Sequence, residues 1–198
     1  MSTKNNNPKG IILILIGMFI VSFMDATFKY INTSVNLYEA YFVRTLISFG
    51  VIASYLKITN KPIIFTTHYP LLTSIRVILF FFGFSSFYIS LTIMPLATAT
   101  ALFFASPFLM TVFAIFFLKE EVGIRRWSAV IIGFIGVYII LNPDFNDFDY
   151  LSLTPVLCAF CYALSMIIIK KTSDKDDVYS QMFHFYIFAI TISLIIYF

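Results

Sequence analysis

Long apolar segments alternate with short polar connections along this chain. Seven apolar segments occur, at residues 10–30, 37–56, 71–93, 96–118, 127–141, 151–169 and 178–198. A helix needs about 20 apolar residues to cross a bilayer, so each segment is close to the length of one membrane span. The fifth is the shortest, and we expect it to borrow residues 123–126 or Asn142 to reach across.

Charge is absent from one long stretch of the chain. Residues 77–118 contain no Asp, Glu, Lys or Arg, which is enough for two spans that break near Met94-Pro95. Spanning segments are either helices or strands of a closed barrel, and barrel strands require an alternation of polarity that these segments lack. The pattern therefore predicts an all-α, polytopic membrane helix bundle.

Composition agrees with this prediction. The chain is 60% hydrophobic and 12% charged, whereas soluble domains contain roughly 25% charged residues. The Lys and Arg residues are distributed unevenly: eleven of thirteen fall on one predicted side, Lys29 falls on the other, and Arg44 lies inside the second segment. Because cytoplasmic loops are enriched in Lys and Arg, we expect a cytoplasmic N-terminus in the cell's inner (plasma) membrane.

A weak internal repeat relates the two ends of the chain. A shift of 141 residues places Lys29, Tyr38 and Phe42 on Lys170, Tyr179 and Phe183. The implied unit is a five-helix repeat over residues 1–143, followed by the first two helices of a second copy over residues 151–198. Five is an odd number, so the second copy would be inverted in the membrane, as in many secondary transporters.

Residues 88–143 contain a series of spaced motifs. They are Tyr88, Leu91, Ser106-Pro107, Leu118-x-Glu120, Trp127 and Gly136-Val137, and Arg44 lies early in the second segment. In these features the chain resembles the EamA-type permeases of the drug/metabolite transporter superfamily. Ala129 is a small departure, since the family often has glycine there. The resemblance implies transport of metabolites such as amino acids, nucleosides, cofactors or drugs.

The resemblance also implies ten spans in two five-helix halves, whereas seven segments are present here. Residues 193–198 are apolar, without a polar tail. We therefore expect a fragment of a longer transporter. The alternative is that two such chains form a homodimer and complete each other.

Ionisable residues inside membrane spans are costly and are therefore candidates for function. Asp25 and Arg44 lie at similar depth on consecutive segments, with Lys29 and Glu39 near the same end. One interpretation is a substrate or coupling-ion site in which Arg44 binds a carboxylate. The other is a structural one, in which two acids and two bases neutralise each other.

Further polar residues lie near the predicted turn at Met94-Pro95. Tyr88, Thr98 and Thr100 are expected either to bind substrate or to bond with each other. Pro107 removes a backbone hydrogen bond in mid-segment, and we expect it to bend or shape that helix.

The histidines and cysteines suggest little enzyme chemistry. His184 lies within the last segment and is a candidate proton carrier, or else a hydrogen-bonding partner of another helix. His68 is interpreted as an ordinary loop residue, and Glu120 as part of a solvated charge network. Cys158 and Cys161 lack a second Cys pair or a nearby His, so we interpret them as small apolar residues and expect no metal site.

These observations favour a secondary-active transporter or exchanger of a small organic metabolite. Its expected partners are the substrate, the lipid bilayer and a coupling ion or proton, without a cofactor or nucleic acid. The alternatives are a membrane-embedded lipid-modifying enzyme and a non-transporting scaffold subunit. No H-E-x-x-H, G-x-S-x-G or phosphate-binding glycine loop occurs in the sequence, which disfavours an enzyme.

Overall fold

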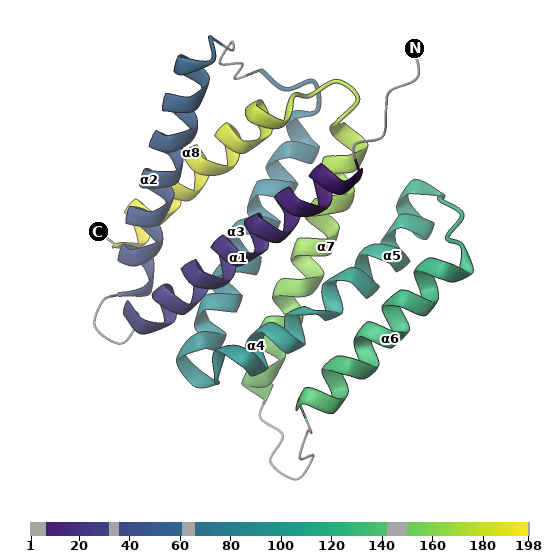
Figure 1. Ribbon diagram of the computed structural model, residues 1–198. Helices are drawn as coiled ribbons and strands as arrows, with labels where there is room; N and C mark the ends of the chain where they lie inside the picture. Colours follow the sequence, from purple (N-terminus) through teal and green to yellow (C-terminus); the bar gives the residue numbers. More distant parts are fainter. Residues whose placement is uncertain (1–6, 32–35, 61–65, 142–149, 198) are drawn as a thin grey trace.

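The computed structural model describes residues 7–31, 36–60, 66–141 and 150–197, and over these ranges the protein is a bundle of helices without strands (Figure 1). The elements are α1 (Asn7–Ile31), α2 (Leu37–Ile58), α3 (Pro70–Ile93), α4 (Leu96–Phe103), α5 (Ala105–Leu118), α6 (Ile124–Leu141), the short 3-10 helix η2 (Tyr150–Leu153), α7 (Thr154–Thr172) and α8 (Val178–Tyr197).

The predicted membrane spans correspond to these helices. Within the described ranges, six helical stretches are long and apolar enough to cross a bilayer: α1, α2, α3, α4 together with α5, α7 and α8. The fifth predicted segment forms α6, which begins at Ile124 and so takes its additional residues from the Arg125-Arg126 side. The all-α membrane bundle is confirmed, and the protein is a multi-pass membrane protein.

The fourth predicted segment is broken into two helices. The break is at Phe104, whose backbone N–H donates to the carbonyls of both Thr100 and Ala101 at 3.1 Å. Pro107 explains the position of the break, because proline has no N–H to donate to the carbonyl four residues earlier, that of Phe103. The sequence analysis expected Pro107 to bend or shape this helix, and the structure places a helix break three residues before it.

Connections between the helices alternate between two ends of the bundle (Figure 1). The α2–α3, α5–α6 and α7–α8 connections lie at one end, which we call the lysine-rich end because it holds Lys57, Lys119 and Lys175. Helices α1 and α7 consequently run in opposite directions, as an inverted repeat requires. The repeat and the cytoplasmic orientation of the lysine-rich end stay predictions.

The most extensive helix contact joins α3 to α7, in the middle of the bundle (Figure 1). Gly83 permits it: a Cβ built on Gly83 would lie only 2.9 Å from the Cβ of Cys161. The contact is reinforced by polar bonds, since Ser86 Oγ donates to the carbonyl of Thr154 at 2.7 Å. Small residues at such contacts let two membrane helices approach closely.

Substituting Gly83→Ala should destabilise the bundle by roughly 1–3 kcal/mol, because the new methyl group would force α3 and α7 apart. The measurement is thermal unfolding of the purified protein in detergent. The matched control is Gly133→Ala on α6, where a Cβ would meet nothing within 4 Å. An equal melting temperature for the two variants would contradict the proposed close contact.

Candidate functional site

Arg44 and Tyr88, two of the residues singled out in the sequence, lie together in the structure. The start of α2 is set by Asn36, whose side-chain oxygen accepts a hydrogen bond from the N–H of Tyr38 at 3.0 Å, and Arg44 follows about two turns later. The guanidinium carbon of Arg44 lies 5.3 Å from the centroid of the Tyr88 ring, a cation–π contact. Tyr88 itself is buried, with its ring 3.9 Å from that of Phe28.

The Arg44 guanidinium is incompletely satisfied. Its Nη1 atom is buried and has no hydrogen-bond partner in the structure. Electrostatic interactions reach it from Tyr41, Asp25 and Tyr186, on three different helices. A buried donor left without an acceptor costs free energy, and a planar guanidinium binds a carboxylate through two parallel hydrogen bonds. The arrangement is therefore suited to binding a carboxylate.

In the structural interpretation of the sequence, Asp25 and Glu39 neutralise Lys29 and Arg44. The structure describes all four side chains and shows no direct ion pair among them. Among the described residues, no ion pair within 4.0 Å joins Asp25 to Arg44 or Lys29. Lys29 Nζ instead donates to the carbonyls of Leu91 at 2.9 Å and Met94 at 2.8 Å, where α3 ends. The last carbonyls of a helix lack partners within it, so a cation is favourable there.

The two threonines predicted to lie beside Tyr88, Thr98 and Thr100, are on the short helix α4. Thr100 Oγ1 donates to the carbonyl of Leu96 at 2.8 Å and lines a groove of about 680 Å³ between α4, α5 and α6. That groove contains Phe104, Arg126 and Gly133 but neither Arg44 nor Tyr88. Thr98 is half-buried on the same short helix. A substrate role for these hydroxyls stays a prediction, and Thr100 belongs to a separate groove.

His184 lies in a third place, in a groove of about 380 Å³ between α3 and α8. Thr73, Ser74, Val77, Ile187, Phe188, Thr191 and Ile192 line it with His184. The Nδ1 atom of His184 lies 2.7 Å from the carbonyl of Ser180. A carbonyl only accepts, so Nδ1 carries a proton in this contact, and Nε2 is the nitrogen that can gain or lose a second one.

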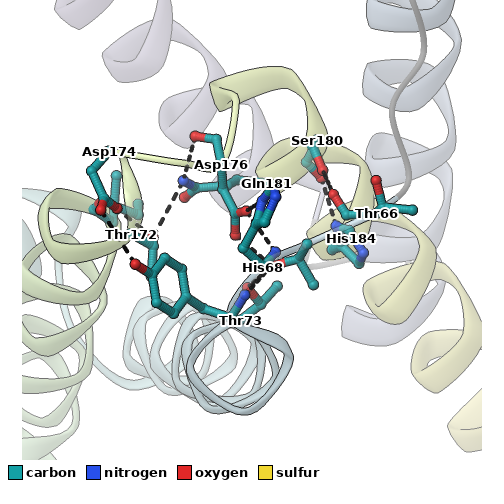
Figure 2. A network of polar contacts seen from close by, with 12 residues as sticks. Thr66, His68, Thr73, Thr172, Asp174, Asp176, Ser180, Gln181 and His184 are labelled. Carbon is teal, nitrogen blue, oxygen red and sulfur yellow. Dashed lines mark hydrogen bonds and ion pairs between the residues drawn. The ribbon is translucent and has the colours of Figure 1, made fainter.

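A cluster of polar residues at the lysine-rich end was not predicted as functional (Figure 2). At its centre is Asp176, in the α7–α8 connection, with a fully buried side chain. Asp176 accepts hydrogen bonds from Thr67 Oγ1, from the backbone N–H of His68 at 2.8 Å, and from the His68 ring at 3.1 Å. Thr67 in turn contacts Thr73 of α3 at 3.0 Å.

Gln181 and Arg76 connect this cluster to the helices below it. Gln181 Nε2 donates to Thr172 Oγ1 at 3.3 Å and to the carbonyl of Asp176 at 3.4 Å. Arg76 was counted among the loop cations from the sequence, but it is buried in the second turn of α3, and its guanidinium donates to the carbonyl of Gln181. Its charge also interacts with that of Asp176.

The carboxylate of Asp176 is ionised at neutral pH. Desolvation by burial alone would raise its pKa, but the hydrogen bonds from Thr67 and His68 hold the pKa of Asp176 below its ordinary value. His68, interpreted from the sequence as an ordinary loop residue, is therefore one of the groups that stabilise a buried charge. No sequence signal marks the pair, because 108 residues separate its members.

Glu120 belongs to a charge network at the lysine-rich end, as expected. It pairs with Lys170 on α7 and, at 3.9 Å, with Arg126 on α6. The preceding residue, Lys119, ends α5 in the left-handed conformation with φ of 53°, and the N–H of Glu120 then donates to the carbonyl of Ala114 at 3.2 Å. This turn directs Glu120 toward α7.

Metal chemistry is unsupported over the described residues, which contain no group of three His, Cys, Asp or Glu side chains that could hold an ion. Cys158 and Cys161 are buried, free thiols at the α3–α7 contact. Their position fits the interpretation as small packing residues.

Comparison with known proteins identifies the family. The sequence profile of the EamA-like transporter family matches residues 8–142. The chain belongs to the EamA-like transporter family. The match covers α1 to α6, including Arg44, Tyr88 and the Glu120 turn, and it confirms the resemblance found in the sequence.

Several relatives of this EamA-like protein carry transporter names. It is 32% identical over 185 residues to the S-adenosylmethionine uptake transporter of Rickettsia prowazekii. The aligned region covers 93% of this chain and 63% of the relative. Over 83 residues it is 41% identical to the riboflavin transporter of Vibrio cholerae, covering 42% of this chain and 28% of the relative. It is 21% identical over 186 residues to the pseudopaline exporter CntI of Pseudomonas aeruginosa, covering 93% of this chain and 65% of the relative.

The EamA-like chain thus spans about 63% of the length of the S-adenosylmethionine transporters that it matches. No solved structure matches it. The family that matches is one of transporters, and these relatives are named as transporters of small metabolites rather than as enzymes. A membrane-embedded enzyme, the first alternative considered from the sequence, is therefore not supported.

Substituting Lys29→Met in this EamA-like chain should lower the free energy of unfolding by roughly 1.5–3 kcal/mol, because two helix-end carbonyls lose a charged donor. Thermal unfolding in detergent measures the effect. The control is Lys57→Met, at an exposed lysine in the last turn of α2, where little change is expected. Equal melting temperatures for the two variants would show that the Lys29 contact adds nothing to stability.

Proposed function

We propose that this chain belongs to a secondary-active transporter that takes up a small zwitterionic metabolite across the cell's inner membrane, with S-adenosylmethionine as the first substrate to test. The observation that carries the proposal is the 32% identity to an S-adenosylmethionine uptake transporter over 93% of this chain. The shorter matches to riboflavin transporters make riboflavin the competing substrate.

Local chemistry around Arg44 supports this choice of substrate. S-adenosylmethionine carries a carboxylate, an ammonium group, a sulfonium cation and a purine ring. The unpartnered Nη1 of Arg44 is the donor for the carboxylate, and Tyr88 holds the guanidinium in place through its ring face. Asp25, half-buried on α1, supplies the negative charge that a cationic group requires.

Substituting Arg44→Ala should lower the initial rate of S-adenosylmethionine uptake by about tenfold to a hundredfold, the range expected for lost charge-assisted hydrogen bonds. Uptake of the radiolabelled compound is measured in proteoliposomes containing the full chain. Arg44→Lys retains the positive charge but not the planar guanidinium that donates two parallel hydrogen bonds. Its uptake rate should therefore lie between those of Arg44→Ala and the parent protein.

Arg125→Ala is the matched control for this experiment, because Arg125 is an exposed arginine at the start of α6 that lines neither groove. It should leave uptake unchanged. Uptake of S-adenosylmethionine no greater than in protein-free liposomes would refute the proposed substrate. Uptake of radiolabelled riboflavin, without uptake of radiolabelled S-adenosylmethionine, would assign riboflavin as the substrate instead.

Proton coupling through His184 is the second element of the proposal. Its support is the position of the ring in the groove between α3 and α8, with Nδ1 held by the carbonyl of Ser180. Histidine is the residue type most often used as a proton carrier, and here the hydrogen bond to the Ser180 carbonyl occupies only one of its ring nitrogens.

Substituting His184→Gln should abolish the stimulation of uptake by an imposed pH gradient, because an amide does not titrate in this range. Exchange of labelled for unlabelled substrate, measured without a gradient, should persist, since exchange requires no net movement of protons. If the variant and the parent respond equally to the gradient, His184 does not couple protons.

A further inference from the structure

The groove between α3 and α8 is mostly apolar, and four polar side chains lie among the apolar ones. They are Thr73, Ser74, His184 and Thr191, which extend from the first turn of α3 to the middle of α8. An ionisable residue inside a span is costly in lipid, so the position of His184 favours contact of the groove with water or a solute. The groove ends at Thr73, where the cluster around Asp176 begins.

The cluster joins two segments that are far apart in the chain. Thr66, Thr67 and His68 precede α3, whereas Asp176 and Ser180 follow α7. Besides the bonds to Asp176, Ser180 Oγ donates to the carbonyl of Thr66 at 3.3 Å, and Tyr69 Oη donates to Asp174 at 3.2 Å (Figure 2). These contacts cross between the segments preceding α3 and α8, the two helices that flank the groove.

Hydrogen bonds at the end of a bundle differ from apolar contacts in its middle. A bond broken next to water is replaced by a bond to water, whereas an apolar contact broken in the middle of the bundle has no such replacement. The bonds of Asp176 lie at the lysine-rich end, where the His68 side chain is 64% exposed. A conformational change is therefore easier at these polar contacts than at the close contact of α3 with α7.

We propose that Asp176 and its donors Thr67 and His68 form a gate that closes the groove between α3 and α8 at the lysine-rich end. This role rests on the proposed transport function. With the gate closed, Asp176 holds the segment before α3 against the start of α8. Release of its hydrogen bonds to water lets the two segments separate and opens the groove between Thr73 and His184. Asp176 is thus a positioning residue that does not itself bind the substrate.

The experiment measures access of water to the groove, without any substrate. Cys158→Ala and Cys161→Ala remove the native thiols, and Val77→Cys then places a reporter on a buried residue that lines the groove. Ser90→Cys, in a separate protein, reports on a buried residue at the opposite end of α3. A water-soluble maleimide reacts with each protein in nanodiscs, where both membrane faces are accessible.

Asp176→Ala should raise the labelling rate at Val77→Cys by at least about tenfold, because each lost hydrogen bond to the ionised carboxylate favours the open state by at least about that factor. Thr67→Val removes one donor with little change in shape and should raise the rate by a smaller factor. The matched control is Ser173→Ala, an exposed residue of the same connection whose Oγ donates to the nearby carbonyl of Lys170 and not across to the segment before α3, so it should leave the rate unchanged. Labelling at Ser90→Cys should stay at its low parent value.

Two outcomes would overturn the gate. An unchanged rate at Val77→Cys in Asp176→Ala and Thr67→Val would show that the cluster does not control the groove. Equal increases at Val77→Cys and Ser90→Cys would show that Asp176 holds the whole bundle together. Both readings are independent of substrate, so a failed gate is distinguishable from a failed uptake assay.

Discussion

The close approach of α3 and α7 is the constraint on which the rest of this structure depends. It requires a residue without a side chain at Gly83, because Cys161 occupies the space where a Cβ would be. Helix α3 then carries Tyr88 toward one end of the bundle and Thr73 toward the other. Helix α7 leads into the connection that holds Asp176. A slip of one residue between the helices, about 1.5 Å, would separate Asp176 from its donors.

Three cationic side chains within the spans differ in the hydrogen-bond acceptors that they find. Lys29 donates to two backbone carbonyls, and Arg76 donates to the Gln181 carbonyl while interacting with Asp176. Arg44 retains one buried nitrogen without an acceptor. An apolar solvent supplies no compensating bond, so the unpaired nitrogen is what supports the proposed binding role of Arg44, whereas Lys29 and Arg76 are satisfied within the protein. Whether the donors of a buried cation all have hydrogen-bond acceptors is therefore more informative about function than the presence of the charge.

Much of the fold follows from local sequence, whereas the pairing of distant groups does not. Hydropathy places the helices correctly, because the bilayer imposes a length that the sequence must match. Pro107 marks the break at Phe104, because its effect acts only four residues away.

The candidate sites were predictable only in part. Arg44 and Tyr88 stand out as polar residues in spans, yet their contact depends on the packing of α2 against α3. The role of Arg76 could not be predicted from its position near a helix start, since its partner Gln181 is 105 residues away. Asp176 resembles any other loop carboxylate until its donors, more than 100 residues earlier, are placed beside it.

The pairing of α3 with α7 also has a consequence for synthesis of the chain. Gly83 and Cys161 are 78 residues apart (161 − 83), and a chain grows at about 5–20 residues per second, so α3 precedes its partner by roughly 4–16 seconds. During that interval Ser86 lacks the Thr154 carbonyl, and Arg76 lacks that of Gln181. Helix α3 is therefore made before the carbonyls that its polar side chains bind in the finished bundle, and these side chains acquire their partners only when α7 and α8 follow.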